Sequence, residues 1–179
     1  SGMLFGEPFT SQSEKGLYRQ IIAMPEDHGN HPAVMFHPSC LGGKALLCRP
    51  GTRDRSSLED LLFNRAYLPP KPLNNPKVIV DLGVNVGYTV AHFAVLYPTA
   101  RIIGLELDTN NFMMAQQNTD WCKDRVTLIN AAIWSSDGYV NFEGRGEDAF
   151  HVVASADAAD DADNATTNRN DRSISMETL

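Results

Sequence analysis

A short stretch of the chain brings together residue types that could bind a nucleoside. Asp81, Gly83, Asn85 and Gly87 stand at alternate positions, and Glu106 follows further along the chain. A glycine at such a turn lets a ligand approach the backbone without meeting a Cβ atom. A carboxylate about twenty residues later has the spacing expected for hydrogen bonds to ribose hydroxyls. This stretch therefore predicts a site for a ligand that contains a ribose.

Two predicted strands and a helix would position these residues. Residues 78–80 are apolar and β-branched and predict a buried strand, and residues 101–107 predict a second buried strand that ends on acidic residues. Residues 88–97 predict a helix that Pro98 ends. Strand, glycine turn, helix and strand in this order form the βαβ plan of a nucleotide-binding half. The apolar residues at helical spacing are Val90, Phe93, Ala94 and Tyr97.

The glycine pattern bears on which nucleotide binds. A dinucleotide fingerprint reads G-x-G-x-x-G, and its middle glycine lets the backbone approach a pyrophosphate. Asn85 stands in that place here. A ligand with an ammonium and a carboxylate needs polar acceptors and donors, which Asp81, Asn85 and the loop amides could supply. An enzyme that binds NAD or a nucleotide sugar is the alternative on the same βαβ unit, and ordinary turn residues of an α/β protein are a third possibility.

Several segments in order resemble the FkbM-type S-adenosylmethionine-dependent methyltransferase family. They read VIVDLGVNVGYTVAHFA, IIGLELDTNNFMMAQQNT and VTLINAAIWSSDG. The corresponding family segments are D-x-G-A-N-x-G, E-P-D-x-x-N-F and N-A-A-x-W or N-A-A-x-G, and residues 49–67 resemble the family's lead-in. The resemblance covers the chain from about residue 48 to residue 142. Val84 and Leu107 stand where the family usually has alanine and often has proline, and neither change removes a polar contact.

The resemblance implies a partial class I methyltransferase core of Rossmann-like α/β fold. Its central, mostly parallel sheet is flanked by helices and preceded by an N-terminal extension. The implied cofactor is S-adenosyl-L-methionine, and the implied reaction is methyl transfer to the hydroxyl oxygen of a small-molecule or glycan-like acceptor. The residues implied to bind the cofactor are Asp81, Gly83, Asn85, Gly87 and Tyr88 around the methionine end, Glu106 at the ribose, and Leu107, Asn130 and Ala131 beside the adenine.

Some of these roles compete with structural ones. Asn130 could equally be a polar residue at a sheet edge, and Asp54 in the lead-in is interpreted as a helix cap rather than a residue of the cleft. A hydroxyl acceptor needs a general base, and the sequence identifies none, because His92 is interpreted as a surface or core residue of its helix. A non-catalytic binding or assembly domain with the same fold is a further alternative.

The chain divides into four predicted parts, and its end resembles the start of a further strand, so we interpret it as truncated at the C-terminus. The open sheet edge of such a fragment could pair with another copy. The parts are an N-terminal extension at 1–75, with a tag remnant at 1–2, a cofactor-binding core at 76–143, a flexible loop rich in Ala, Asp and Asn at 144–172, and the start of the missing part at 173–179.

Composition restricts the partners and the compartment. The 179 residues are 42% hydrophobic and 21% charged, which is typical of one globular domain. The net charge of −7 argues against nucleic acid as the main partner. The sequence contains no apolar run of membrane-spanning length and no secretory pattern, so we expect a cytoplasmic protein. Three scattered cysteines, Cys40, Cys48 and Cys122, predict free thiols.

The remaining segments give less specific expectations. His28, His31, His37 and Cys40 match no metal-ligand spacing, so we expect no metal site. Ser56 or Ser57 is expected to cap a helix that runs to about Asn64. The other predicted elements are a helix at 14–24, paired strands at 33–36 and 44–48, a helix at 110–118 that buries Phe112, Met113 and Ala115, a strand at 126–133, a turn at 135–138, and a strand at 139–142 that pairs back in a hairpin.

Overall fold

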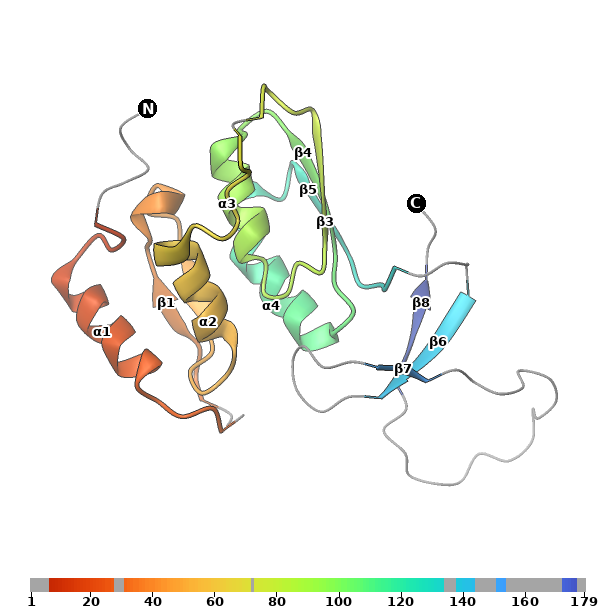
Figure 1. The fold of residues 1–179 in the computed structure, drawn as a ribbon, viewed down its shortest axis with the longest axis horizontal. Helices are drawn as coiled ribbons and strands as arrows, with labels where there is room; N and C mark the ends of the chain where they lie inside the picture. Colours follow the sequence, from red (N-terminus) through yellow and green to blue (C-terminus); the bar gives the residue numbers. More distant parts are fainter. Residues whose placement is uncertain are drawn as a thin grey trace.

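A three-stranded parallel sheet organises the molecule (Figure 1). The computed structural model describes residues 7–27, 31–71, 73–133, 138–143, 151–153 and 172–176. The sheet has the order β3-β4-β5, with Asp81 opposite Gly104 and Leu105 opposite Ile129. Its elements are β3 (Val78–Leu82), α3 (Tyr88–Leu96), β4 (Arg101–Leu105), α4 (Thr109–Thr119), η3 (Asp120–Cys122) and β5 (Val126–Ile129). This alternation confirms the predicted α/β fold, a partial Rossmann-like arrangement.

The two faces of the sheet differ. Alternate residues of a strand point to opposite faces, and α3 and α4 cover only one of them. On the other face Val78, Val80 and Leu82 are exposed by 54, 48 and 57%. The prediction of a buried strand at residues 78–80 is therefore wrong for both valines, because they lie on the face of the sheet that none of the described helices covers. The apolar core between the sheet and these helices consists of Ile79, Val84, Val90, Phe93, Ala94, Ile102, Ala115, Trp121, Cys122, Val126 and Leu128.

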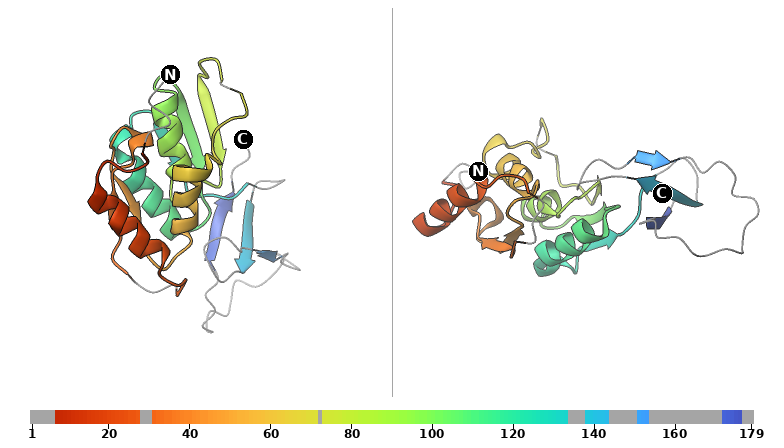
Figure 2. Two further views of the ribbon diagram at one scale, coloured as in Figure 1. Left: turned by 60° about the vertical axis from the view of Figure 1, so that its left-hand side comes forward. Right: turned by 90° about the horizontal axis from the view of Figure 1, so that it is seen from below.

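The residues before β3 form a lead-in that packs on the outer side of α3 and α4 (Figures 1 and 2). Its two short strands pair antiparallel, with Met35 opposite Leu47, as predicted. Helix α1 begins at an N-cap serine, Ser11, whose hydroxyl accepts a hydrogen bond from the Glu14 backbone N–H at 3.2 Å. The lead-in consists of α1 (Gln12–Ile22), β1 (Val34–Phe36), η1 (Ser39–Leu41), β2 (Leu46–Cys48), α2 (Asp54–Glu59) and η2 (Asp60–Asn64).

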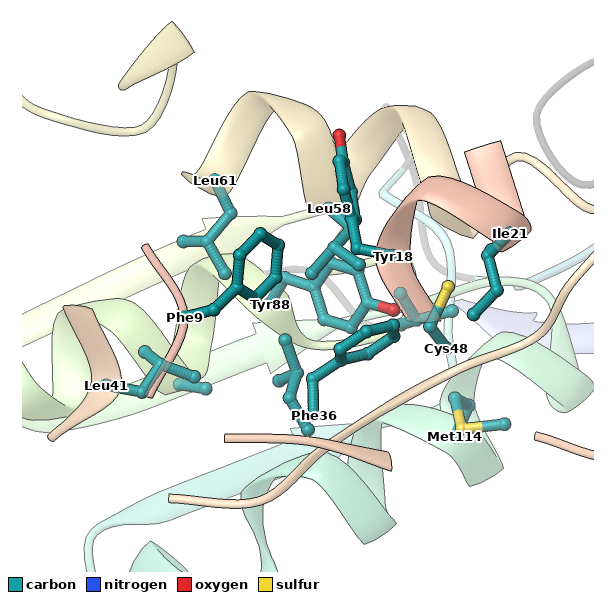
Figure 3. Packing of buried hydrophobic residues seen from close by; sticks show 13 residues of the cluster. Phe9, Tyr18, Ile21, Phe36, Leu41, Cys48, Leu58, Leu61, Tyr88 and Met114 are labelled. Carbon is teal, nitrogen blue, oxygen red and sulfur yellow. The ribbon is translucent and has the colours of Figure 1, made fainter. Parts of the chain in front are cut away.

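A second apolar core joins the lead-in to α3. The Tyr88 ring lies among Phe9, Phe36 and Leu58 (Figure 3), and its hydroxyl donates a hydrogen bond to the Leu47 carbonyl at 2.8 Å. A buried Tyr hydroxyl needs such a partner, which the middle residue of β2 provides. Helix α3 is therefore packed on both sides, against the sheet and against the lead-in.

A buried ion pair also fixes the lead-in. The Asp54 carboxylate is 1% exposed and accepts hydrogen bonds from the Arg49 backbone N–H, Nε and Nη2 at 2.7–2.9 Å. The same Nη2 donates to Asn111 Oδ1 on α4 at 2.7 Å. The predictions that Asp54 is a cap and that α2 begins at Ser56 or Ser57 are therefore wrong. The helix starts at Asp54, and both serines lie within it.

Helix α4 buries Ala115 as predicted, but it differs from the prediction at its two methionines. Met114 is buried and Met113 is 52% exposed, although the sequence predicted that Met113 faces the core. Asn118 is buried as well, and its amide donates to the Val86 carbonyl at 2.8 Å and accepts from the Leu47 N–H at 2.7 Å. The face of α4 that meets the lead-in is therefore partly polar, and apolar spacing alone could not predict it.

A small antiparallel sheet follows the core, in the order β7-β6-β8 (Figure 1). It contains β6 (Gly138–Glu143), β7 (His151–Val153) and β8 (Arg172–Met176). The predicted strand at 139–142 exists, but it pairs with β7 and β8 rather than back onto the core. Strand β7 lies inside the predicted loop at 144–172, and most of that loop and of the predicted turn at 135–138 lies outside the described residues. Among the helices that are described, none has the length and apolarity to cross a bilayer.

Candidate cofactor site

A pocket of about 270 Å³ opens where the three parallel strands end. Ligands of α/β proteins bind at this edge of a parallel sheet. Glu106 is the charged residue of the pocket wall, and the other lining residues are apolar or glycine. The pocket is lined by Leu82, Gly83, Leu105, Glu106, Leu107, Ala131, Ala132 and Ile133.

The two glycines of the loop have different physical roles. Gly83 and Gly87 both have positive φ, of 89° and 83°, a conformation that favours glycine. A Cβ atom on Gly83 would have nothing within 4 Å, so the space beside it is open to a ligand. A Cβ atom on Gly87 would lie 2.9 Å from the Ala115 Cα, so Gly87 instead lets α3 begin against α4.

The Glu106 carboxylate joins the loops on either side of the pocket. Its Oε2 accepts from the Asn85 N–H and its Oε1 accepts from the Asp108 N–H, each at 2.8 Å. Asp108 in turn caps α4 by accepting from the Asn111 N–H at 2.8 Å. Burial raises the pKa of Glu106. Backbone hydrogen bonds from Asp108, Asn85 and Leu107 oppose this rise, and the Asp108 charge adds to it. Each carboxylate oxygen has a further lone pair, so Glu106 can also accept hydrogen bonds from ligand hydroxyls.

A polar corner beside this loop contains two buried acceptors. Asp81 Oδ2 and Asn85 Oδ1 have no hydrogen-bond partner within the described part of the chain. Burial raises the pKa of Asp81, because the charged form is poorly solvated there. Burial also raises the pKa of Tyr67. A hydrogen bond with Ser57 opposes this rise, and the charges of Asp60 and then Asp81 add smaller contributions to it. Since a buried acceptor without a partner costs free energy, this corner is suited to a ligand with several N–H donors.

The structure brings some predicted site residues together and separates others. Gly83, Glu106, Leu107 and Ala131 line the same pocket, and their roles toward a cofactor stay predictions. The prediction of Tyr88 as a cofactor contact is wrong for its side chain, which lies in the core of the lead-in. Asn130 does not line the pocket either, and neither do Asp81, Asn85 and Gly87. The Asn130 amide donates to the Glu106 and Leu107 carbonyls at 2.7 and 3.1 Å and so holds the turn after β4.

The described residues contain no clear proton acceptor for a hydroxyl substrate and no metal cluster. His92 is buried on α3, outside the pocket lining, and burial lowers its pKa. In the ranges covered by the structure, no three His, Cys, Asp or Glu side chains are grouped as metal ligands would be. Sequence reasoning did not identify Ser57 as a neighbour of the site, because its contact with Asn85 spans 28 residues and matches no motif.

Comparisons with known proteins support a resemblance to methyltransferases. The chain is 38% identical to catechol O-methyltransferase from Sus scrofa over 60 residues. This matched segment covers 32% of the chain and 32% of that protein. A solved FkbM methyltransferase from Methylobacillus flagellatus overlaps 46% of this chain and 23% of its own, with 19% identity and a TM-score of 0.36. A Pyrococcus horikoshii structure, provisionally assigned as a transferase, overlaps 58% of this chain and 38% of its own, with 19% identity and a TM-score of 0.42.

Each of these matches covers only part of the two proteins compared. The chain spans about a third of the length of the curated relative that it matches. Both TM-scores are below 0.5, so neither structural overlap assigns a role to a residue of this chain. No family model matches the sequence. The resemblance to methyltransferases that the motifs predicted is thus supported by the curated match.

Proposed function

We propose that this chain is the cofactor-binding part of an S-adenosylmethionine-dependent methyltransferase. The observation that carries the proposal is the combination of an apolar pocket containing Glu106 with two buried acceptors that have no partner in the described residues, Asp81 Oδ2 and Asn85 Oδ1. An adenosyl amino acid has the matching groups in one molecule: a flat apolar base, a ribose with two hydroxyls, and an ammonium.

Each end of the site has its own residues. Asp81 and Asn85 would accept hydrogen bonds from the ammonium, as their unpaired oxygen atoms require. Glu106 would accept from the ribose hydroxyls through its remaining lone pairs. Leu107 and Ala131, in the apolar part of the pocket, would contact the adenine.

Bound S-adenosylmethionine would supply a methyl group on a positively charged sulfur, already activated for in-line transfer. The protein then has to orient the acceptor and exclude water, and both lower the barrier without covalent help. The proposed acceptor is a hydroxyl oxygen of a small or glycan-like molecule. Glu106 is the one ionisable residue among the described residues that line the pocket, and it is assigned to the ribose, so none of them is proposed as a general base.

The charges of the site favour this ligand over NAD or a nucleotide sugar. A pyrophosphate would lie near the carboxylates of Asp81 and Glu106, and none of the described pocket-lining residues is basic. Asn85 also occupies the position at which a dinucleotide site has its middle glycine. Both features oppose the approach of two phosphates to the start of α3.

Calorimetric titration tests the proposal. We expect S-adenosylhomocysteine to bind the 179-residue chain and NAD to give no heat. Glu106→Ala should weaken S-adenosylhomocysteine at least tenfold, since about 1.4 kcal/mol is tenfold in affinity and a hydrogen bond to a charged group contributes about 1.5–3 kcal/mol. Glu59→Ala is the control, because Glu59 is exposed on α2. Heat from NAD alone, or equal affinity of both variants, would overturn the assignment.

Catalysis needs a separate test, because a non-catalytic domain could bind the same ligand. The chain is incubated with a methyl-labelled cofactor and a pool of small hydroxylated acceptors. Transfer of label to an acceptor supports an enzyme. Tight cofactor binding without any transfer supports the binding domain instead.

A further inference from the structure

Ser57 contacts the candidate site from a different part of the chain. It lies on α2 of the lead-in, and its Oγ accepts a hydrogen bond from Asn85 Nδ2 at 3.3 Å. The same serine shares a hydrogen bond with the Tyr67 hydroxyl. Ser57 and Tyr67 thus form one side of the corner that also contains Asp81 and Asn85.

The Asn85 amide is held in one of its two possible orientations. Its backbone has a φ of 50°, and the backbone N–H donates to Glu106 Oε2 at 2.8 Å. With Nδ2 directed at Ser57, Oδ1 points the other way and has no partner among the described residues. A serine hydroxyl can donate as well as accept, so this orientation requires that the Ser57 proton be directed at the Tyr67 oxygen. If the amide then rotated by 180°, Oδ1 would face the Ser57 oxygen, and an NH₂ group would take the place of the acceptor.

We propose that Ser57 is a positioning residue, which orients the Asn85 amide so that the site presents an acceptor to the ammonium group of its ligand. This inference rests on the proposed function and extends it to a residue of the lead-in. Asp81 would bind the ammonium by charge, and Asn85 would complete its hydrogen bonds. The site should therefore prefer adenosyl ligands that carry a primary ammonium group over those that lack one.

Three ligands and four proteins test the role of Ser57. S-adenosylhomocysteine carries the ammonium and the carboxylate, S-adenosylthiopropylamine carries only the ammonium, and methylthioadenosine carries neither. Ser57→Ala removes the hydroxyl, and Ser57→Thr retains it. Ser56→Ala is the matched control, because Ser56 is the neighbouring residue of α2 and is exposed.

We expect Ser57→Ala to weaken both ammonium ligands about tenfold, the loss expected for one charge-assisted hydrogen bond. Methylthioadenosine should bind all four proteins equally, and Ser57→Thr should restore most of the affinity. Equal weakening of all three ligands would overturn the proposal, since it would mean a general structural role. Unchanged affinity for the ammonium ligands would overturn it as well. If the unmodified chain binds none of the three, the proposed function itself fails.

Discussion

Replacing Asp54 by alanine would leave the Arg49 guanidinium without its buried partner. Asp54 accepts three hydrogen bonds from Arg49, and the side chains are 1% and 18% exposed. Water therefore cannot replace the lost carboxylate fully. The substitution also lets the Arg49 guanidinium move, so its hydrogen bond to Asn111, which joins the lead-in to α4, is no longer held in place.

The expected loss is large for a single substitution. Removing one partner of a buried, hydrogen-bonded ion pair costs about 3–5 kcal/mol. For a chain of this length each kcal/mol lowers the melting temperature by about 2–4 °C, so we expect a decrease of about 6–20 °C. The assays are urea unfolding and thermal unfolding followed by circular dichroism. Asp120→Ala is the control, because the Asp120–Lys123 pair is 69% and 71% exposed and should therefore lower the melting temperature far less.

A double-mutant cycle separates the ion pair from other effects. If Arg49 and Asp54 stabilise the fold through each other, Arg49→Ala adds little further loss once Asp54 is already alanine. A loss below about 1 kcal/mol for Asp54→Ala, comparable with the surface control, would refute the reasoning. Strict additivity of the two substitutions would refute it as well.

Three further predictions concern the loop, the buried histidine and the effect of pH on binding. Gly87→Ala should lower the free energy of unfolding by about 2 kcal/mol or more, because its Cβ would meet the Ala115 backbone. Gly83→Ala should lower it by only about 1 kcal/mol, through backbone strain, but should weaken ligand binding. The pKa of His92 is lowered by burial, so the free energy of unfolding should decrease as pH falls below about 6.5, and His92→Leu should remove this decrease in pH-dependent urea titrations. Burial raises the pKa of Asp81. As the pH is lowered, S-adenosylhomocysteine should therefore begin to lose affinity at a higher pH than it would with an Asp of ordinary pKa, while the affinity of methylthioadenosine should not change.

The local pattern of the sequence predicted the elements that position the site. Residues 78–80 and 101–105 became strands, and the glycines became the left-handed residues that end β3 and begin α3. These features depend on side-chain branching and on backbone freedom, which neighbouring residues determine. The place of Glu106 followed from the same logic, since the carboxyl ends of adjacent parallel strands meet at one edge.

The contacts of the lead-in could not be predicted in this way. Asp54 has the sequence features of a helix cap, and only the folded chain shows that Arg49 and Asn111 enclose it. Met113 and Met114 are equally apolar, so the sequence could not decide which of them faces the core. Burial of an edge strand likewise depends on which faces are covered, a property of the whole fold.

Helix α2 explains why the lead-in belongs to the site. Asp54 and Ser57 are three residues apart on this helix, so both side chains lie on the side that meets the core. Asp54 fixes the helix through Arg49, which also reaches α4, and Ser57 then meets the Asn85 amide at a defined place. Asn85 is joined through Glu106 to the N-cap residue of α4. Because these contacts form a connected set, a change at Asp54 should also weaken ammonium binding, although Asp54 does not line the pocket.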